Sequence, residues 1–152
     1  KGYMRTGAEF DWPFAPTNTG GVADMQVFPD KSVSGAFSTH RMDPSRPDAF
    51  FLAWHPDSKV LVGYVWDPRD FPWLGIWEEN RCRNVPPWNG QTITRGMEFG
   101  MSPMPESRRQ MIERGSLFGT PAYRWLPARK TLRVKYKALL TGSETVPAAL
   151  PI

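Results

Sequence analysis

Proline and glycine interrupt this sequence so often that a mainly helical fold is disfavoured. The 152-residue chain contains 16 prolines and 13 glycines, and both residue types interrupt helices. Turn-forming clusters such as DWPFAPTNTGG and RMDPSRPD occupy much of the first 48 residues. Only short regular segments fit between the turns, so we expect strands joined by long loops.

Apolar runs between these turns predict the strands. The runs AFFLAW (49–54) and KVLVGYVW (59–66) flank the four-residue turn HPDS, which is typical of a hairpin. Further strands are expected at 73–79, 92–101 and 131–141, with shorter ones near 23–28 and 34–39 and a short helix over 106–114. In the segment 131–141, apolar residues alternate with basic ones, which predicts one core face and one solvent face.

These elements predict an all-β fold. The connections are too short for crossover helices, so we expect antiparallel pairing, and a β-sandwich is the natural architecture. The length suits a single domain over residues 1–152, and residues 142–152 read as a loose tail.

Charge and cysteine content narrow the function classes. The net charge is +4, but the basic residues are scattered, so we expect no nucleic-acid partner, and a basic nucleic-acid-binding domain is only a weaker alternative. No apolar run reaches the roughly 20 residues of a membrane span. Cys82 is the only cysteine, which forbids an intrachain disulfide. A reducing compartment fits and we favour the cytoplasm, but a secreted protein without disulfides fits too. The two histidines lie far apart in sequence, and we expect no metal site and no cofactor.

The stretch TRGMEFGMSP (94–103) contains the first candidate for chemistry. Strand alternation places Glu98 on one face together with Gly96 and Gly100, so the carboxylate has empty positions on both sides. A ligand could approach the backbone there and meet Glu98. The alternative, about equally favoured, is that the glycines make room for a tryptophan while Glu98 pairs with an arginine.

A similar pattern occurs in WLGIWEEN (73–80), where Trp73, Trp77 and Glu79 share a face. Aromatic rings beside carboxylates are how proteins hold sugars, because the ring stacks on C–H groups and the acid accepts hydroxyl protons. Each tryptophan taken singly is more commonly a core residue. His40, at the end of an expected strand, is a further candidate for substrate binding or proton transfer.

Three segments together resemble the galactose mutarotase-like superfamily, which includes the aldose 1-epimerases. GMEFGMSP is similar to the family strand that carries a Leu-Glu-Thr-Gln-type motif, and it keeps the Glu but not the Thr-Gln. WLPARKTLRVKY is similar to the last family segment, and GAEFDWP to a Gly-x-x-Phe-Asp element. The resemblance covers most of residues 7–141 in order.

The resemblance implies a β-supersandwich and, in active members, interconversion of sugar anomers. It implies that Glu98 is the general base that takes the anomeric proton, while the family's histidine acid falls ahead of Lys1. It also implies that the chain is the C-terminal half of a larger domain, with the N-terminal half of the same fold as a partner.

We therefore expect a carbohydrate-binding protein with a monosaccharide or glycan ligand. In the enzymatic reading it is an aldose 1-epimerase with Glu98 as the catalytic residue. The sugar-binding residues are then Trp73, Trp77, Glu79, Gly96, Gly100 and His40. The alternative is a non-catalytic sugar-binding module or an accessory domain of a polysaccharide-active enzyme.

Overall fold

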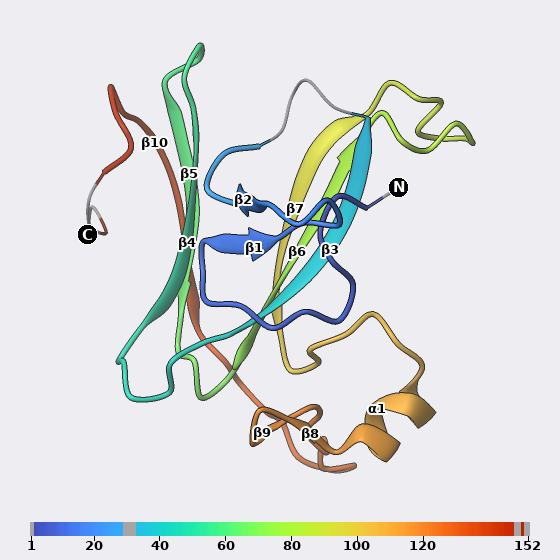
Figure 1. Ribbon diagram of the computed structural model, residues 1–152. Helices are drawn as coiled ribbons and strands as arrows, with labels where there is room; N and C mark the ends of the chain where they lie inside the picture. Colours follow the sequence, from blue (N-terminus) through green and yellow to red (C-terminus); the bar gives the residue numbers. More distant parts are fainter. Residues whose placement is uncertain (1, 29–32, 148–149, 151–152) are drawn as a thin grey trace. The chain divides into compact units, whose positions relative to one another are not determined.

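The computed structural model describes residues 2–28, 33–147 and 150 (Figure 1). Its described part contains ten strands and one short helix, and every strand pair with a recorded register is antiparallel. The expectation of an all-β, antiparallel fold is confirmed at this level. The chain divides into two compact units, one of residues 1–40 and 74–99 and the other of residues 41–73 and 100–152.

The first unit is built on a three-stranded sheet with the order β3-β6-β7 (Figure 1). These strands are β3 (Ser34–Arg41), β6 (Trp73–Asn80) and β7 (Ile93–Gly100), close to three of the predicted runs. A small ribbon pairs β1 (Phe14–Pro16) with β2 (Val22–Asp24). Since β6 is the central strand, nearly all of its side chains are buried.

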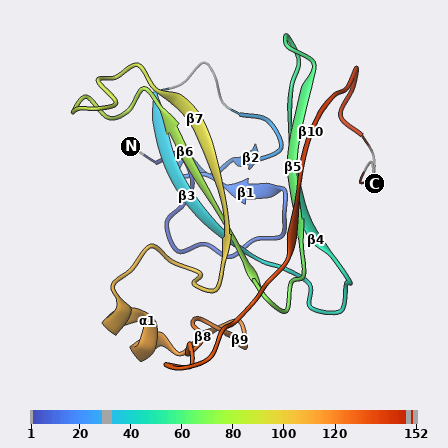
Figure 2. The same ribbon diagram turned by 180° about the vertical axis from the view of Figure 1, so that it is seen from behind.

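The second unit contains a sheet with the order β10-β5-β4, seen from behind in Figure 2. The predicted hairpin is present as β4 (Ala49–His55) and β5 (Val60–Trp66), with Ala49 opposite Trp66 and His55 opposite Val60. The unit also holds α1 (Arg108–Arg114) and the short pair β8 (Ser116–Leu117) and β9 (Thr120–Pro121). Helix α1 begins after Ser107, whose hydroxyl and Gln110 form a capping box.

The last strand differs from its prediction. Strand β10 covers Tyr136–Gly142 and leaves residues 131–135 outside regular structure. Tyr136, placed by alternation on the core face, is 57% exposed, and Ala138 is exposed too. The prediction of a core face there is wrong, because alternation tells which side chains share a face but not whether that face is covered.

The tail predicted over 142–152 has local attachments where it is described. The Trp54 indole N–H donates to the Ser143 carbonyl at 2.9 Å, and Lys59 pairs with Glu144. Residues 148–149 and 151–152 lie outside the described part. Within the described ranges, no helix is both long and apolar enough to cross a membrane.

Candidate functional site

The pairing of β6 with β7 brings Trp77, Gly96 and Glu98 together. The Arg81 amide donates to the Thr92 carbonyl at 2.8 Å, at the point where the two strands leave the sheet. A Cβ built on Gly96 would lie 3.5 Å from the Trp77 ring and 3.7 Å from Glu98 Oε1. The indole of β6 and the carboxylate of β7 therefore share the space that Gly96 leaves empty.

Glu98 is exposed on this surface. In the described part of the chain, its carboxylate has no hydrogen-bond donor and no ion-pair partner. The alternative interpretation was that the glycines make room for a tryptophan while Glu98 pairs with an arginine. Its first half is observed, because Gly96 makes room for Trp77. The other half is not observed, because no arginine of the described part forms an ion pair with Glu98. An exposed carboxylate beside an aromatic ring is free to accept hydrogen bonds from a ligand.

Arg83 lies between two tryptophan rings. Its guanidinium carbon is 5.2 Å from the centre of the Trp77 ring and 5.0 Å from that of Trp88, within the range of cation–π attraction. The Arg83 side chain is 45% exposed. We call the surface formed by Trp77, Arg83, Trp88, Gly96 and Glu98 the Trp77 face.

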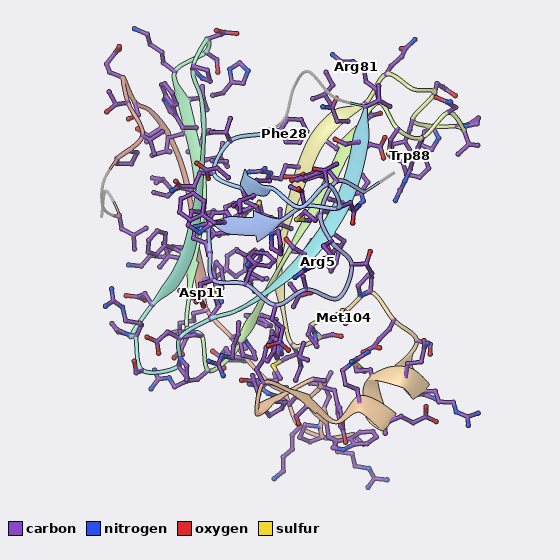
Figure 3. All side chains as sticks on the ribbon, in the orientation of Figure 1. Arg5, Asp11, Phe28, Arg81, Trp88 and Met104 are labelled. Carbon is purple, nitrogen blue, oxygen red and sulfur yellow. The ribbon has the colours of Figure 1, made fainter. Side chains whose placement is uncertain are left out.

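Trp88 comes from the loop 81–92, which leaves β6 and returns to β7 (Figure 3). This loop is closed by its own backbone hydrogen bonds, such as Gly90 N–H to Arg83 O at 2.8 Å and Gln91 N–H to Trp88 O at 3.0 Å. Gly90 has a φ of 68°, and a Cβ there would lie 2.8 Å from Asn84 Oδ1, so the backbone conformation at this position favours glycine. The sequence analysis missed Arg83 and Trp88. The available signal was an arginine and a tryptophan in a loop rich in Pro, Asn and Gly.

The position of Glu79 does not fit its predicted role as a sugar-binding residue. It is fully buried, and its oxygens accept hydrogen bonds from the backbone amides of Cys82 at 2.8 Å and Arg83 at 2.9 Å. The Cys82 thiol also donates to it at 3.2 Å. Burial by itself raises the pKa of Glu79, but these hydrogen bonds and the Arg83 charge outweigh it and lower the pKa below its usual value. Since Glu79 is occupied by its own loop, it is not available to a ligand.

Two further predicted residues lie at the ends of the strands. Trp73, the first residue of β6, is fully buried, and its indole N–H donates to the Pro121 carbonyl at 2.8 Å. It is therefore a core residue, as tryptophans commonly are, rather than a free ring for a sugar. Gly100, the last residue of β7, has no heavy atom within 4 Å of the position of a Cβ, so it leaves open space.

His40 is not part of the Trp77 face. The Phe37 ring lies 2.9 Å from the position of a Cβ on Gly75, so odd-numbered residues of β3 share the face of Gly75 and Trp77. His40 points to the opposite face, where it contacts the rings of Phe10 and Trp12 and lies 2.9 Å from the Ser38 hydroxyl. Burial lowers the pKa of His40 to about 4, so the imidazole is neutral at pH 7.

That opposite face holds a buried polar group that the sequence analysis did not predict. Glu78 forms an ion pair with Arg95 and accepts a hydrogen bond from the Tyr3 hydroxyl at 2.8 Å. Arg95 also donates to the Met25 carbonyl at 2.8 Å and lies over the Phe28 ring. The signal was present, since alternation places Arg95 on the otherwise apolar face of Met97 and Phe99. The group ties residues 3–28 to the sheet, and Arg95 Nε is buried within it with no hydrogen-bond partner among the described residues.

No metal centre is indicated. Among the described residues, no group of three or more His, Cys, Asp or Glu side chains is placed to hold a metal ion. Comparison of the chain with protein-family models, with curated proteins and with solved structures finds no match. The geometry of the Trp77 face and the motif resemblance are therefore the evidence for function.

Proposed function

We propose that this chain is a carbohydrate-binding protein of the mutarotase-like β-sandwich type, with the Trp77 face as its sugar-binding surface. The observation that carries the proposal is the exposed Glu98 carboxylate, which shares with the Trp77 ring the space that Gly96 leaves open. Within the described ranges, this carboxylate has no ion-pair partner. A sugar ring offers a C–H face that packs on the indole and hydroxyl groups that donate to the carboxylate. Binding sites commonly combine an aromatic surface with a few polar groups in this way.

An aldose 1-epimerase is the second candidate, and the same carboxylate favours it. A general base must reach the proton it abstracts and must not be consumed by an internal ion pair. Among the described residues Glu98 has no ion-pair partner, and its exposure leaves it open to a sugar. His40 cannot supply the matching acid to a sugar on this face, because it points to the other side of the sheet. Sugar binding is therefore the better supported reading.

Titration and polarimetry separate these readings. D-glucose and D-galactose are titrated against the protein while tryptophan fluorescence is recorded, and the mutarotation of each freshly dissolved α-anomer is followed with and without protein. The proposal predicts saturable binding that Glu98→Gln weakens about tenfold, or about 1.4 kcal/mol. Glu113→Gln, which changes an exposed glutamate of helix α1, is the matched control.

The outcomes distinguish binding from catalysis. Saturable binding without acceleration of mutarotation assigns a sugar-binding module. Acceleration that is lost in Glu98→Gln assigns the epimerase. Absence of saturable binding to these sugars and to a wider glycan panel contradicts the proposed function.

A further inference from the structure

The buried carboxylate of Glu79 needs a specific reason, because an ionised group removed from water is costly unless it is paired. Glu79 is fully buried. One oxygen accepts from the Cys82 and Arg83 amides, and the other is 3.2 Å from the Cys82 sulfur and 3.3 Å from Arg83 Nε. All four contacts go to the first residues of the loop 81–92. These contacts with Cys82 and Arg83 compensate for the burial of the Glu79 charge, and they also fix the start of the loop 81–92.

The contact with Arg83 also fixes a side chain of the Trp77 face. The Nε atom of Arg83 faces Glu79, while the guanidinium carbon lies 5.2 Å from one tryptophan ring centre and 5.0 Å from the other. A guanidinium is planar, so holding one edge of it helps to set the orientation of the whole group. Glu79 thus acts on the same arginine from which both Trp77 and Trp88 take their cation–π contact.

The Cys82 thiol is closely packed between its neighbours. A Cβ on Gly35 would lie 2.6 Å from the Cys82 sulfur, so the thiol fits against β3 only because residue 35 is glycine. The Glu79 carboxylate also contacts that sulfur, at 3.2 Å. Burial, and then the hydrogen bond to Glu79, raise the pKa of the Cys82 thiol, so it remains a donor at neutral pH.

We propose that Glu79 is a positioning residue that holds Arg83 between Trp77 and Trp88 and so pre-orders the sugar-binding surface. The proposal rests on the proposed function of the Trp77 face. A surface ordered before binding loses less conformational freedom when a ligand arrives. Glu79 itself touches no ligand and acts through Arg83.

A double-mutant cycle tests this role in the full chain. Glu79→Gln, Arg83→Met and the double variant are titrated with whichever of D-glucose and D-galactose the wild-type protein binds. We expect each single variant to weaken binding about tenfold and the double variant to be no weaker than Arg83→Met alone, since residues that act as a unit are not additive. Effects that multiply instead would show that Glu79 does not act through Arg83 and would overturn the proposal.

Measurements on Glu79→Gln without sugar test the positioning role of Glu79 independently of the proposed sugar binding. In Glu79→Gln, we expect faster hydrogen exchange at the Cys82 and Arg83 amides, a weaker near-ultraviolet circular dichroism signal from the tryptophans, and a lower thiol pKa measured by thiolate absorbance. Unchanged values of all three would overturn the proposal even if sugar binds. If the wild-type protein binds no sugar, the proposed function fails, and these measurements alone decide whether Glu79 holds the loop.

A second variant covers the case in which Glu79→Gln does not fold. Arg83→Lys retains the positive charge and both amide donors to Glu79, but it lacks the planar guanidinium. We expect it to keep the amide protection at residues 82 and 83 while losing the tryptophan dichroism and about tenfold in affinity. Wild-type dichroism in Arg83→Lys would contradict the arrangement of Arg83 between the two rings.

Discussion

Arg95 and Glu78 form an ion pair across strands β6 and β7, on the face of the sheet opposite Trp77 and Glu98. Both side chains are shielded from solvent, with exposed fractions of 17% for Arg95 and 1% for Glu78. The Tyr3 hydroxyl completes the group. The two strands therefore carry charge on both faces. Glu78 is paired, whereas Glu98 has no ion-pair partner among the residues that the structure describes. This contrast separates the polar group that stabilises the fold from the one that can meet a ligand.

Breaking the Arg95–Glu78 pair should destabilise the protein strongly. Removing one partner leaves a buried charge uncompensated, so Arg95→Met should lower the free energy of unfolding by about 3–5 kcal/mol. The double variant Glu78→Gln with Arg95→Met should recover a large part of that loss, because no charge is then left buried. Urea denaturation measures both. A single variant that costs no more than the double variant would show that the pair is not coupled.

Gly96 and Gly100 form a matched pair for testing the open space on the Trp77 face. A Cβ on Gly96 meets only ordinary contacts, at 3.5 Å and beyond, and one on Gly100 meets none within 4 Å. Gly96→Ala should therefore fold normally, with an unfolding free energy raised by about 0.5 kcal/mol, and lose about tenfold in sugar affinity because the methyl group fills the space beside Glu98. Gly100→Ala tests the empty position on the other side of Glu98. Wild-type sugar affinity in both variants would exclude the space beside Glu98 from the binding surface.

His40 should make stability fall on acidification. Its pKa is lowered from 6.5 to about 4 by burial, so between these pH values the unfolded chain binds a proton that the folded protein does not. The contribution of His40 to the free energy of unfolding is fully present above pH 6.5. It decreases by up to about 3 kcal/mol as the pH falls to 4. Urea denaturation of the wild type and of His40→Gln across this range isolates the effect. Parallel stability curves for the two proteins would contradict the lowered pKa of the half-buried His40.

Trp73 and Trp77 should respond differently to truncation although four residues separate them on one strand. Trp73 is fully buried and bonded to the Pro121 carbonyl, so Trp73→Ala should cost about 3–5 kcal/mol of stability. Trp77 is only partly buried, and its loss should cost less. Thermal and urea unfolding of the two variants give the comparison, and a larger cost at Trp77 would contradict its assignment to a ligand surface.

Local sequence pattern was sufficient to predict four of the longer strands. The apolar runs identified β4, β5, β6 and β7 within a few residues, and alternation placed Trp77 on one face with Glu79. It could not show that the loop 81–92 folds back and covers Glu79, because that depends on the amides of Cys82 and Arg83. Nor could it give the β6–β7 register that sets Trp77 beside Gly96. Both depend on contacts between separate segments, which periodicity within one segment does not encode.

The most direct test of the account compares two tryptophans of the same chain by isothermal titration calorimetry with D-glucose and D-galactose. Trp77 lies beside Glu98 on the proposed sugar surface, whereas Trp125 is 70% exposed elsewhere in the chain. We predict saturable binding that Trp77→Ala weakens at least about tenfold and Trp125→Ala leaves unchanged. Binding that is unaffected by Trp77→Ala, or equally weakened by both substitutions, would contradict the assignment of the Trp77 face.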